Sequence, residues 1–266
     1  MMGAMSRLEG FIEGRFAYGA HDCPVFTKGE GPPILVMHEV PGITPEVERF
    51  ANLLVSRGFS VYMPELFGKA GREATMPIIL MEMAKRPCIR REFSLLARRG
   101  SSPLTEYLRA LSRDIHARTG QKVGAIGMCI TGNFALALMV DEHLMAPVLA
   151  QPSLPLPLGR SFKRALHMSD EALMTAKRRV AEEGVEILGL RYHGDPLCPP
   201  ERFDRLSEEF GEAFIRIELS PTDRNPDSPI PKPHSPLTAE LVEDPTHPTM
   251  RAFERVVSFF DDHLRD

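Results

Sequence analysis

Short apolar runs bounded by glycine or proline alternate along the chain with longer segments in which apolar residues recur every three or four positions. The short runs have the length of buried strands, and the longer segments have the period of amphipathic helices. Strands are expected at 33–37, 59–63, 123–126, 147–151, 185–192 and 213–219. Helices are expected at 45–57, 103–115, 134–139, 170–183, 200–210 and 248–264.

This alternation predicts the α/β class, with a mostly parallel sheet covered by helices on both faces. Residues 15–27 are expected to add an irregular hairpin or an edge strand. Residues 1–266 are expected to form a single domain, because α/β folds commonly run about 200–250 residues as one unit. Residues 69–101, rich in Met and Arg but weakly periodic, predict a cap-like insertion or irregular helices.

Composition and charge narrow the function classes. The apolar fraction of 43% is ample for one core, and a net charge of −4 gives no basic field for nucleic acid or an anionic membrane. No stretch approaches 18 apolar residues, and the first residues lack the apolar core of a signal peptide. The four cysteines form no C-x-x-C pair, which favours reduced thiols in the cytoplasm.

Candidate chemistry begins with residues 122–140, KVGAIGMCITGNFALALMV. A short strand, a glycine-punctuated turn and an apolar helix, with Cys129 at the apex, have the pattern of a nucleophile elbow. Side chains at Gly127 or Gly132 would strike the neighbouring strand or helix as the chain doubles back. The apex thiol is expected to stand exposed at a helix N-terminus, whose N–H groups favour a thiolate and an oxyanion. The alternative is a small buried core cysteine.

Four polar residues each follow a predicted strand: Glu39, Cys129, Asp195 and His234. Because chemistry in parallel sheets lies beyond the carboxyl ends of the strands, all four are expected at one rim. The chain order of nucleophile, acid and histidine is that of the α/β-hydrolases. The sequence therefore predicts an α/β-hydrolase fold with a Cys-His-Asp triad.

Each assignment has an alternative. Asp195 lies in a Gly-Asp-Pro turn, where Asp is also favoured because its side chain bonds nearby backbone. The competitors of His234 for the role of base are His167, His193 and His247. His193, Asp195 and Cys198 could together suggest a metal site. That spacing matches no tetrahedral zinc pattern, so no metal is expected.

From about residue 30 to the end, the chain resembles the dienelactone hydrolases. The resemblance rests on five motifs in the same order: VMHEVPG at 36–42, MPELFG at 63–68, GMC at 127–129, GDP at 194–196 and HS at 234–235. Each motif alone is weak, but the ordered set is fairly specific. The resemblance implies cysteine-based hydrolysis of a small ester or lactone, without a cofactor.

The resemblance also implies roles for single residues. His234, oriented by Asp195, would help generate the Cys129 thiolate and later activate water against the thioester. Glu39 matches a family glutamate that contacts the thiol and takes part in its activation; an ordinary exposed loop carboxylate is the alternative. Backbone N–H groups are expected to form the oxyanion hole, and these are Ile130 and Val40.

The sequence departs from the family pattern at two positions. Thr131 stands where the elbow usually has its last glycine, with Gly132 after it, so a tighter turn is expected. Thr238, four residues past the histidine, replaces one of the two arginines that clamp the substrate carboxylate in the family. The other clamp could come from Arg90 or Arg91, which could equally be solvated helix charges. A substrate other than dienelactone is therefore expected.

The expected partner is a small-molecule ester or lactone, and the expected assembly is a monomer or a small homo-oligomer. Two other function classes stay open. An acyl-transferring enzyme would use the same thiol in a site that excludes water. A non-catalytic thiol sensor would carry a reactive Cys129 that turns over no ester.

Overall fold

The computed structural model of the chain describes residues 7–84 and 102–265. Eight strands form one sheet in the order β1-β2-β4-β3-β5-β6-β7-β8. The first two form an antiparallel hairpin at one edge, and all pairings from β4 to β8 are parallel. The strands are β1 Ile12–Tyr18, β2 His21–Lys28, β3 Pro33–Met37, β4 Ser60–Pro64, β5 Val123–Met128, β6 Leu144–Ala150, β7 Ile187–Tyr192 and β8 Phe214–Leu219. The predicted mostly parallel sheet is confirmed.

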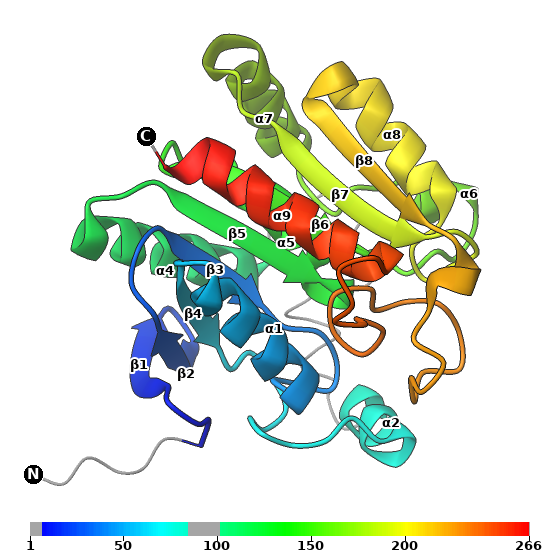
Figure 1. The fold of residues 1–266 in the computed structure, drawn as a ribbon. Helices are drawn as coiled ribbons and strands as arrows, with labels where there is room; N and C mark the ends of the chain where they lie inside the picture. The colour runs from blue at the N-terminus through cyan, green and yellow to red at the C-terminus, as the bar shows by residue number, and fades with distance from the viewer. Residues whose placement is uncertain (1–6, 85–101, 266) are drawn as a thin grey trace, which may run out of the picture.

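Helices cover both faces of this sheet (Figure 1). The α-helices are α1 Pro45–Ser56, α2 Met76–Ala84, α4 Pro103–Thr119, α5 Gly132–Leu138, α6 Arg160–Lys163, α7 Asp170–Glu183, α8 Pro200–Phe210 and α9 Pro248–Leu264. Short 3-10 turns are η1 Cys129–Thr131, η2 Gly211–Ala213 and η3 Pro221–Asp223. No helix in these described ranges is both long and apolar enough to cross a membrane.

Two separate apolar cores lie on the two faces of the sheet. One packs α4, α5, α7 and α8 against one face, and the other packs α1 and α9 against the opposite face. Successive side chains of β3 point to opposite faces of the sheet and contribute to both cores. Leu35 and Met37 pack in the first core, and Ile34 and Val36 pack in the second. This division explains why β3 and β5 are continuously apolar, as strands buried on both faces must be.

Local signals in the sequence position several helices. Thr44 caps α1 through its side chain, which accepts a hydrogen bond from the N–H of Val47, and Pro45 occupies the first turn. Ser102 and Thr105 form a reciprocal capping box at the start of α4. These caps fix where α1 and α4 begin.

Several boundaries differ from those predicted. The N-terminal segment forms a hairpin at the sheet edge, as one of the two expectations had it, but the hairpin is regular and begins at Ile12, three residues before the predicted start. β6 begins at Leu144, three residues before the predicted start, and α5 begins at Gly132, two residues before. In residues 69–101, α2 is the helix that the structure describes, and residues 85–101 lie outside the described residues, so the cap-like insertion stays a prediction.

Candidate active site

The elbow runs from β5 through the 3-10 turn η1 into α5. Cys129 at its apex has a φ of +56°, in the left-handed region that costs a non-glycine residue on the order of 1–3 kcal/mol. A Cβ on Gly127 would lie 2.2 Å from the main-chain oxygen of Thr131. A Cβ on Gly132 would lie 2.6 Å from Cα of Pro152. The predicted need for glycine at both positions is confirmed.

The presence of Thr131 in place of a glycine had suggested a tighter turn. The Thr131 side chain instead makes hydrogen bonds within the elbow. Its Oγ1 accepts a hydrogen bond of 2.8 Å from the N–H of Met128 and lies 2.7 Å from the main-chain oxygen of Met37 on β3. The Thr131 side chain therefore ties the elbow to the neighbouring strand. Between Thr131 and the residue after it, the position that has no room for a side chain is Gly132, which faces Pro152.

The thiol of Cys129 is not exposed above the sheet. Cys129 is 6% exposed, and residues on the surrounding loops, including Glu39, Gln151 and Ser235, are buried as well. The expectation of an exposed apex is therefore wrong. An isolated strand-turn-helix unit would leave its apex open, whereas tertiary packing buries this one.

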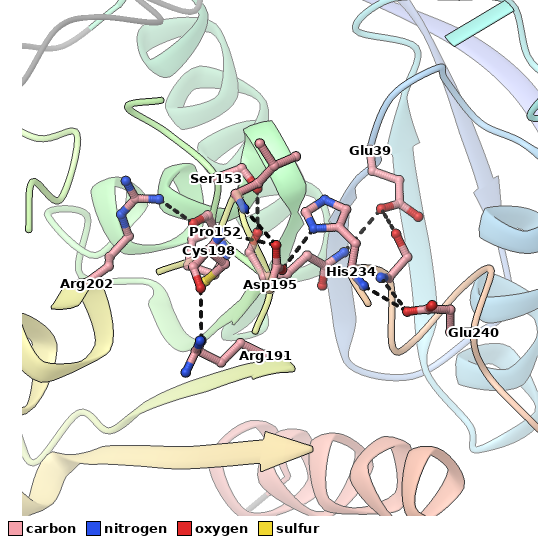
Figure 2. Close-up of polar contacts among 12 residues, drawn as sticks. Glu39, Pro152, Ser153, Arg191, Asp195, Cys198, Arg202, His234 and Glu240 are labelled. Carbon is pink, nitrogen blue, oxygen red and sulfur yellow. Dashed lines mark hydrogen bonds and ion pairs between the residues drawn. The ribbon is translucent and has the colours of Figure 1, made fainter. Parts of the chain in front are cut away.

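Asp195 and His234 come from loops after β7 and β8 and meet at the rim of the sheet (Figure 2). Nδ1 of His234 lies 2.9 Å from Oδ2 of Asp195. The other oxygen, Oδ1, accepts hydrogen bonds from the main-chain N–H groups of Leu197 at 2.8 Å and Cys198 at 3.2 Å. Asp195 therefore makes both kinds of contact that were considered for it, since its turn holds one oxygen and His234 contacts the other.

The second nitrogen of His234 is left for the thiol. Nε2 is buried and makes no hydrogen bond to any residue of the described ranges. Burial alone would lower the pKa of His234. The charge of Cys129, with the contacts that Asp195 and the thiol make to the ring, outweighs burial and raises the pKa of His234 well above its usual value. The structure thus brings the imidazole to the thiol and holds its far side on a carboxylate.

Glu39 lies beside this group and is buried, unlike an ordinary loop carboxylate. Its Oε2 accepts hydrogen bonds from Oγ of Ser235 at 2.7 Å and from Nε2 of Gln151 at 3.1 Å. Its Oε1 accepts one from Oγ1 of Thr238. Burial raises the pKa of Glu39, although His234 and these three uncharged donors act in the opposite direction. Thr238, where the family has an arginine, therefore holds Glu39.

The predicted oxyanion donors lie at the ends of adjacent strands. β3 and β5 pair with Met37 opposite Gly127. Val40 follows three residues after Met37, and Ile130 follows directly after Cys129 in the 3-10 turn. Their N–H groups stay a prediction for the oxyanion hole. The predicted substrate contacts, Arg90 and Arg91, lie outside the described residues.

The histidines that competed with His234 lie in other settings. His247 caps α9 through its side chain, which accepts a hydrogen bond from the N–H of Thr249. The side chain of His193 is 58% exposed and lies 3.9 Å from Glu218. His167 is buried with its ring edge-on to Phe134. Within the part of the chain that the structure describes, His234 is the histidine that pairs with Asp195.

Sequence patterns gave no sign of Glu240, which supports His234 from behind. Glu240 is fully buried, and its Oε2 accepts hydrogen bonds from the main-chain N–H groups of His234 at 2.9 Å and Ser235 at 3.1 Å (Figure 2). Its Oε1 forms an ion pair with Arg224, which also donates to the main-chain oxygen of Ile230. A buried carboxylate paired in this way fixes the loop after β8.

Arg202 holds the opposite side of the elbow and was also not expected. Its buried guanidinium donates to the main-chain oxygens of Pro152 at 2.6 Å, Pro155 at 2.6 Å and Ala165 at 3.1 Å. Burial lowers the pKa of Arg202 to about 10. Since Pro152 packs on Gly132 and the N–H of Ser153 donates to the oxygen of Cys129 at 2.9 Å, Arg202 anchors the segment against which the elbow rests.

Comparison with known proteins identifies the family of the chain. A model of the dienelactone hydrolase family matches residues 23–177, more than half of the chain. The chain belongs to the dienelactone hydrolase family. This membership places the protein among ester hydrolases with the α/β-hydrolase fold. A comparison with curated proteins found no significant match.

Solved structures of dienelactone hydrolase-like proteins share the fold over nearly the whole chain. A dienelactone hydrolase-like promiscuous phosphotriesterase from metagenomic libraries has a TM-score of 0.62 at 18% identity, covering 96% of this chain and 98% of its own. The dienelactone hydrolase from Anabaena variabilis has a TM-score of 0.58 at 15% identity, covering 97% and 100%. A zinc-bound cold-adapted esterase from an Arctic intertidal metagenomic library has 0.58 at 15%, covering 98% and 97%. At these identities the likeness shows the fold alone.

Proposed function

We propose that this dienelactone hydrolase family member cleaves a small ester or lactone through the thiol of Cys129, with His234 as the base and Asp195 as its orienting acid. The observation that carries the proposal is the state of the His234 ring. Asp195 holds Nδ1 at 2.9 Å, so Nδ1 carries the hydrogen and Nε2 is left to accept the thiol proton.

In the first half of the reaction, Nε2 of His234 takes the proton of the thiol. The thiolate attacks the carbonyl carbon of the ester, and the negative charge moves to the carbonyl oxygen. The N–H groups of Ile130 and Val40 would receive this oxygen, because they flank Cys129 at the ends of β5 and β3. When the C–O bond breaks, the leaving alkoxide takes the proton from His234, and the acyl group stays on sulfur as a thioester.

In the second half, water replaces the alcohol. Nε2 of His234 accepts a proton from the water as its oxygen attacks the thioester carbonyl. The C–S bond then breaks, the carboxylic acid leaves, and the sulfur recovers its proton from His234. The raised pKa of His234 supports this cycle, since it shows that the ring is more readily protonated beside Cys129 and Asp195 than in water.

Glu39 contributes a charge near the ring rather than a proton. Burial raises the pKa of Glu39, but hydrogen bonds from uncharged donors to both of its oxygens, together with His234, act in the opposite direction and stabilise the carboxylate form. His234 is the charged group that acts on Glu39. We therefore assign Glu39 the role of stabilising the protonated imidazole that forms in both halves of the reaction.

The substrate differs from dienelactone in the group that the family clamps. Thr238 cannot form the two parallel hydrogen bonds that an arginine gives to a carboxylate, and its hydroxyl is already bound to Glu39. We therefore propose an ester or lactone whose acyl part needs no carboxylate clamp at this position.

Release of p-nitrophenol from a short-chain aryl ester tests the proposal, with and without an added alcohol. Hydrolysis by the wild type that is lost in Cys129→Ala supports it. An ester product formed only with the alcohol would indicate acyl transfer, which the low exposure of Cys129 makes a reasonable second function because bulk water has little access. No turnover of any ester, with a reactive Cys129, would indicate a thiol sensor.

A further inference from the structure

Gln151 lies directly beside the nucleophile. β5 and β6 are parallel neighbours, and Met128 is paired with Ala150 at their ends. Cys129 directly follows β5, and Gln151 directly follows β6. Both have a positive φ, +56° for Cys129 and +35° for Gln151. Backbone strain of this kind in a residue other than glycine persists only where the surrounding structure imposes it, and it gathers at functional sites.

The side chain of Gln151 reaches from Cys129 toward His234. Gln151 is 1% exposed, and its Nε2 donates to Oε2 of Glu39 at 3.1 Å. The same carboxylate oxygen accepts from Ser235, the residue after His234. The amide of Gln151 therefore donates to the same oxygen of Glu39 that accepts from Ser235 in the His234 loop. The backbone of Gln151 lies beside that of Cys129.

The other end of this amide has no partner among the residues that the structure describes. Oε1 of Gln151 is buried and accepts no hydrogen bond from any residue in 7–84 or 102–265. A buried carbonyl oxygen left in this way costs about 1–3 kcal/mol. Its orientation is set by Glu39, because a carboxylate that already accepts from Ser235 and Thr238 needs the N–H side of the amide. The acceptor is therefore turned away from Glu39.

We propose that Oε1 of Gln151 accepts a hydrogen bond from the water that hydrolyses the acyl-enzyme. The inference rests on the proposed function, since it requires an acyl group on Cys129. Water has two hydrogens. As its oxygen forms a bond to the thioester carbon, one hydrogen goes to Nε2 of His234 and the other is held by Oε1 of Gln151. The C–S bond breaks, the second hydrogen leaves with the carboxylic acid, and the thiolate recovers the first from His234.

Gln151 is thus a residue of the second half of the reaction. Two hydrogen-bond acceptors on one water fix the direction of its oxygen lone pair, and such positioning accelerates attack. The proposal predicts slow deacylation, with acylation largely retained, when the acceptor is removed. A residue that only supported the fold would slow both halves together.

The test follows the lifetime of the acylated Cys129 peptide by quenched-flow mass spectrometry after mixing with an aryl ester. In Gln151→Met, which keeps the length of the side chain but not its polar ends, the lifetime is expected to increase about tenfold or more. The matched control is Thr238→Val, which also removes one uncharged donor from Glu39 but leaves Oε1 of Gln151 in place. Its lifetime is expected to change much less.

Gln151→Glu adds a readout in pH. A protonated Glu at 151 can donate to Glu39 and accept with its other oxygen, as the amide does, whereas two adjacent carboxylates repel once the shared proton is lost. The acyl-enzyme lifetime of Gln151→Glu, divided by that of the wild type, is expected to rise with pH. This variant also keeps the test open if Gln151→Met does not fold.

The outcomes separate this inference from the function on which it rests. Equal acyl-enzyme lifetimes in Gln151→Met and Thr238→Val would overturn the inference, because Gln151 would then act only as a donor to Glu39. A pH-independent ratio for Gln151→Glu would overturn it as well. Failure to find any acyl group on Cys129 of the wild type would instead contradict the proposed function.

Discussion

Nδ1 of His234 lies 2.9 Å from Oδ2 of Asp195, although the two residues are 39 positions apart in the chain. Asp195 is itself held by two main-chain N–H groups, so its free oxygen has a fixed direction. The pair sets the tautomer of the imidazole and leaves Nε2 for the thiol. This arrangement gives the first prediction.

Asp195→Asn should keep the fold but place the hydrogen of His234 on the wrong nitrogen. An amide at this position can offer its N–H to Nδ1, so that Nε2 carries the hydrogen and cannot accept the thiol proton. We expect kcat for an aryl ester to fall by about 10³–10⁴-fold. Steady-state kinetics checks this. A fall of less than tenfold would mean that Asp195 only shapes its turn.

Glu240→Gln should loosen the loop that carries His234. The change removes the counter-charge of Arg224 and weakens the bonds to the N–H groups of His234 and Ser235. We expect the free energy of unfolding to fall by about 1–3 kcal/mol, and kcat to fall more than KM changes. Urea unfolding and steady-state kinetics measure the two effects.

The matched control is Asp114→Asn, which breaks an ion pair with Arg118 whose arginine side chain is 66% exposed. Such a pair contributes about 0–1 kcal/mol, so little change is expected in stability or rate. Equal effects of the two substitutions would show that Glu240 has no special part in holding the loop.

Thr131→Val should destabilise the elbow without enlarging it. The substitution leaves the N–H of Met128 buried without its partner, which costs about 1–3 kcal/mol. Thr131→Ser keeps the hydroxyl and should retain most of the stability. Urea denaturation of both variants measures their free energies of unfolding. A Thr131→Val protein as stable as the wild type would show that this hydroxyl does not hold the turn.

The stability of the protein should depend on pH through His38. His38 is fully buried, its Nε2 accepts a hydrogen bond from the N–H of Leu66 at 3.0 Å, and burial lowers its pKa to about 4. In the unfolded chain His38 has a pKa near 6.5. Between about pH 4 and 6.5, the unfolded state therefore binds a proton at His38 that the folded state does not bind. The contribution of His38 to the free energy of unfolding is complete above pH 6.5. This free energy falls by about 3 kcal/mol as the pH drops toward 4.

His38→Gln isolates this contribution. His143, whose pKa burial also lowers to about 4, acts in the same range, so the variant should lose only part of the pH dependence. The difference in unfolding free energy between wild type and variant, measured by urea denaturation from pH 4 to 7, should grow with pH up to about 6.5. A constant difference would contradict the assignment.

Much of the fold follows from the sequence because its strands are buried on both faces and read as continuous apolar runs. The start of β6 was missed because Pro147 resembles a strand boundary. In the structure Pro147 lies inside the strand, opposite Ala125, next to a register shift between Val123 and Gly124. A proline lacks a ladder donor, and the irregular pairing nearby accommodates it.

The site could be predicted where a residue with a reactive or titratable side chain follows a strand. Cys129, Asp195 and His234 each follow a strand, and parallel strands end at the same rim. The burial of Cys129 could not be predicted, because it depends on tertiary packing around the elbow, which no local pattern in the sequence encodes. Gln151 and Glu240 could not be predicted either, since their partners are main-chain groups or carboxylates brought near by the fold and no spacing in the sequence marks them.

The central claim is that Cys129 carries the acyl group during turnover. Peptide mass spectrometry after rapid mixing with a short-chain aryl ester tests it most directly. We predict an increase equal to the acyl group on the peptide that contains Cys129, formed and lost within one turnover and absent in Cys129→Ala, which should not hydrolyse the ester. Hydrolysis at the wild-type rate by Cys129→Ala, or turnover with no acylated Cys129, would contradict the account.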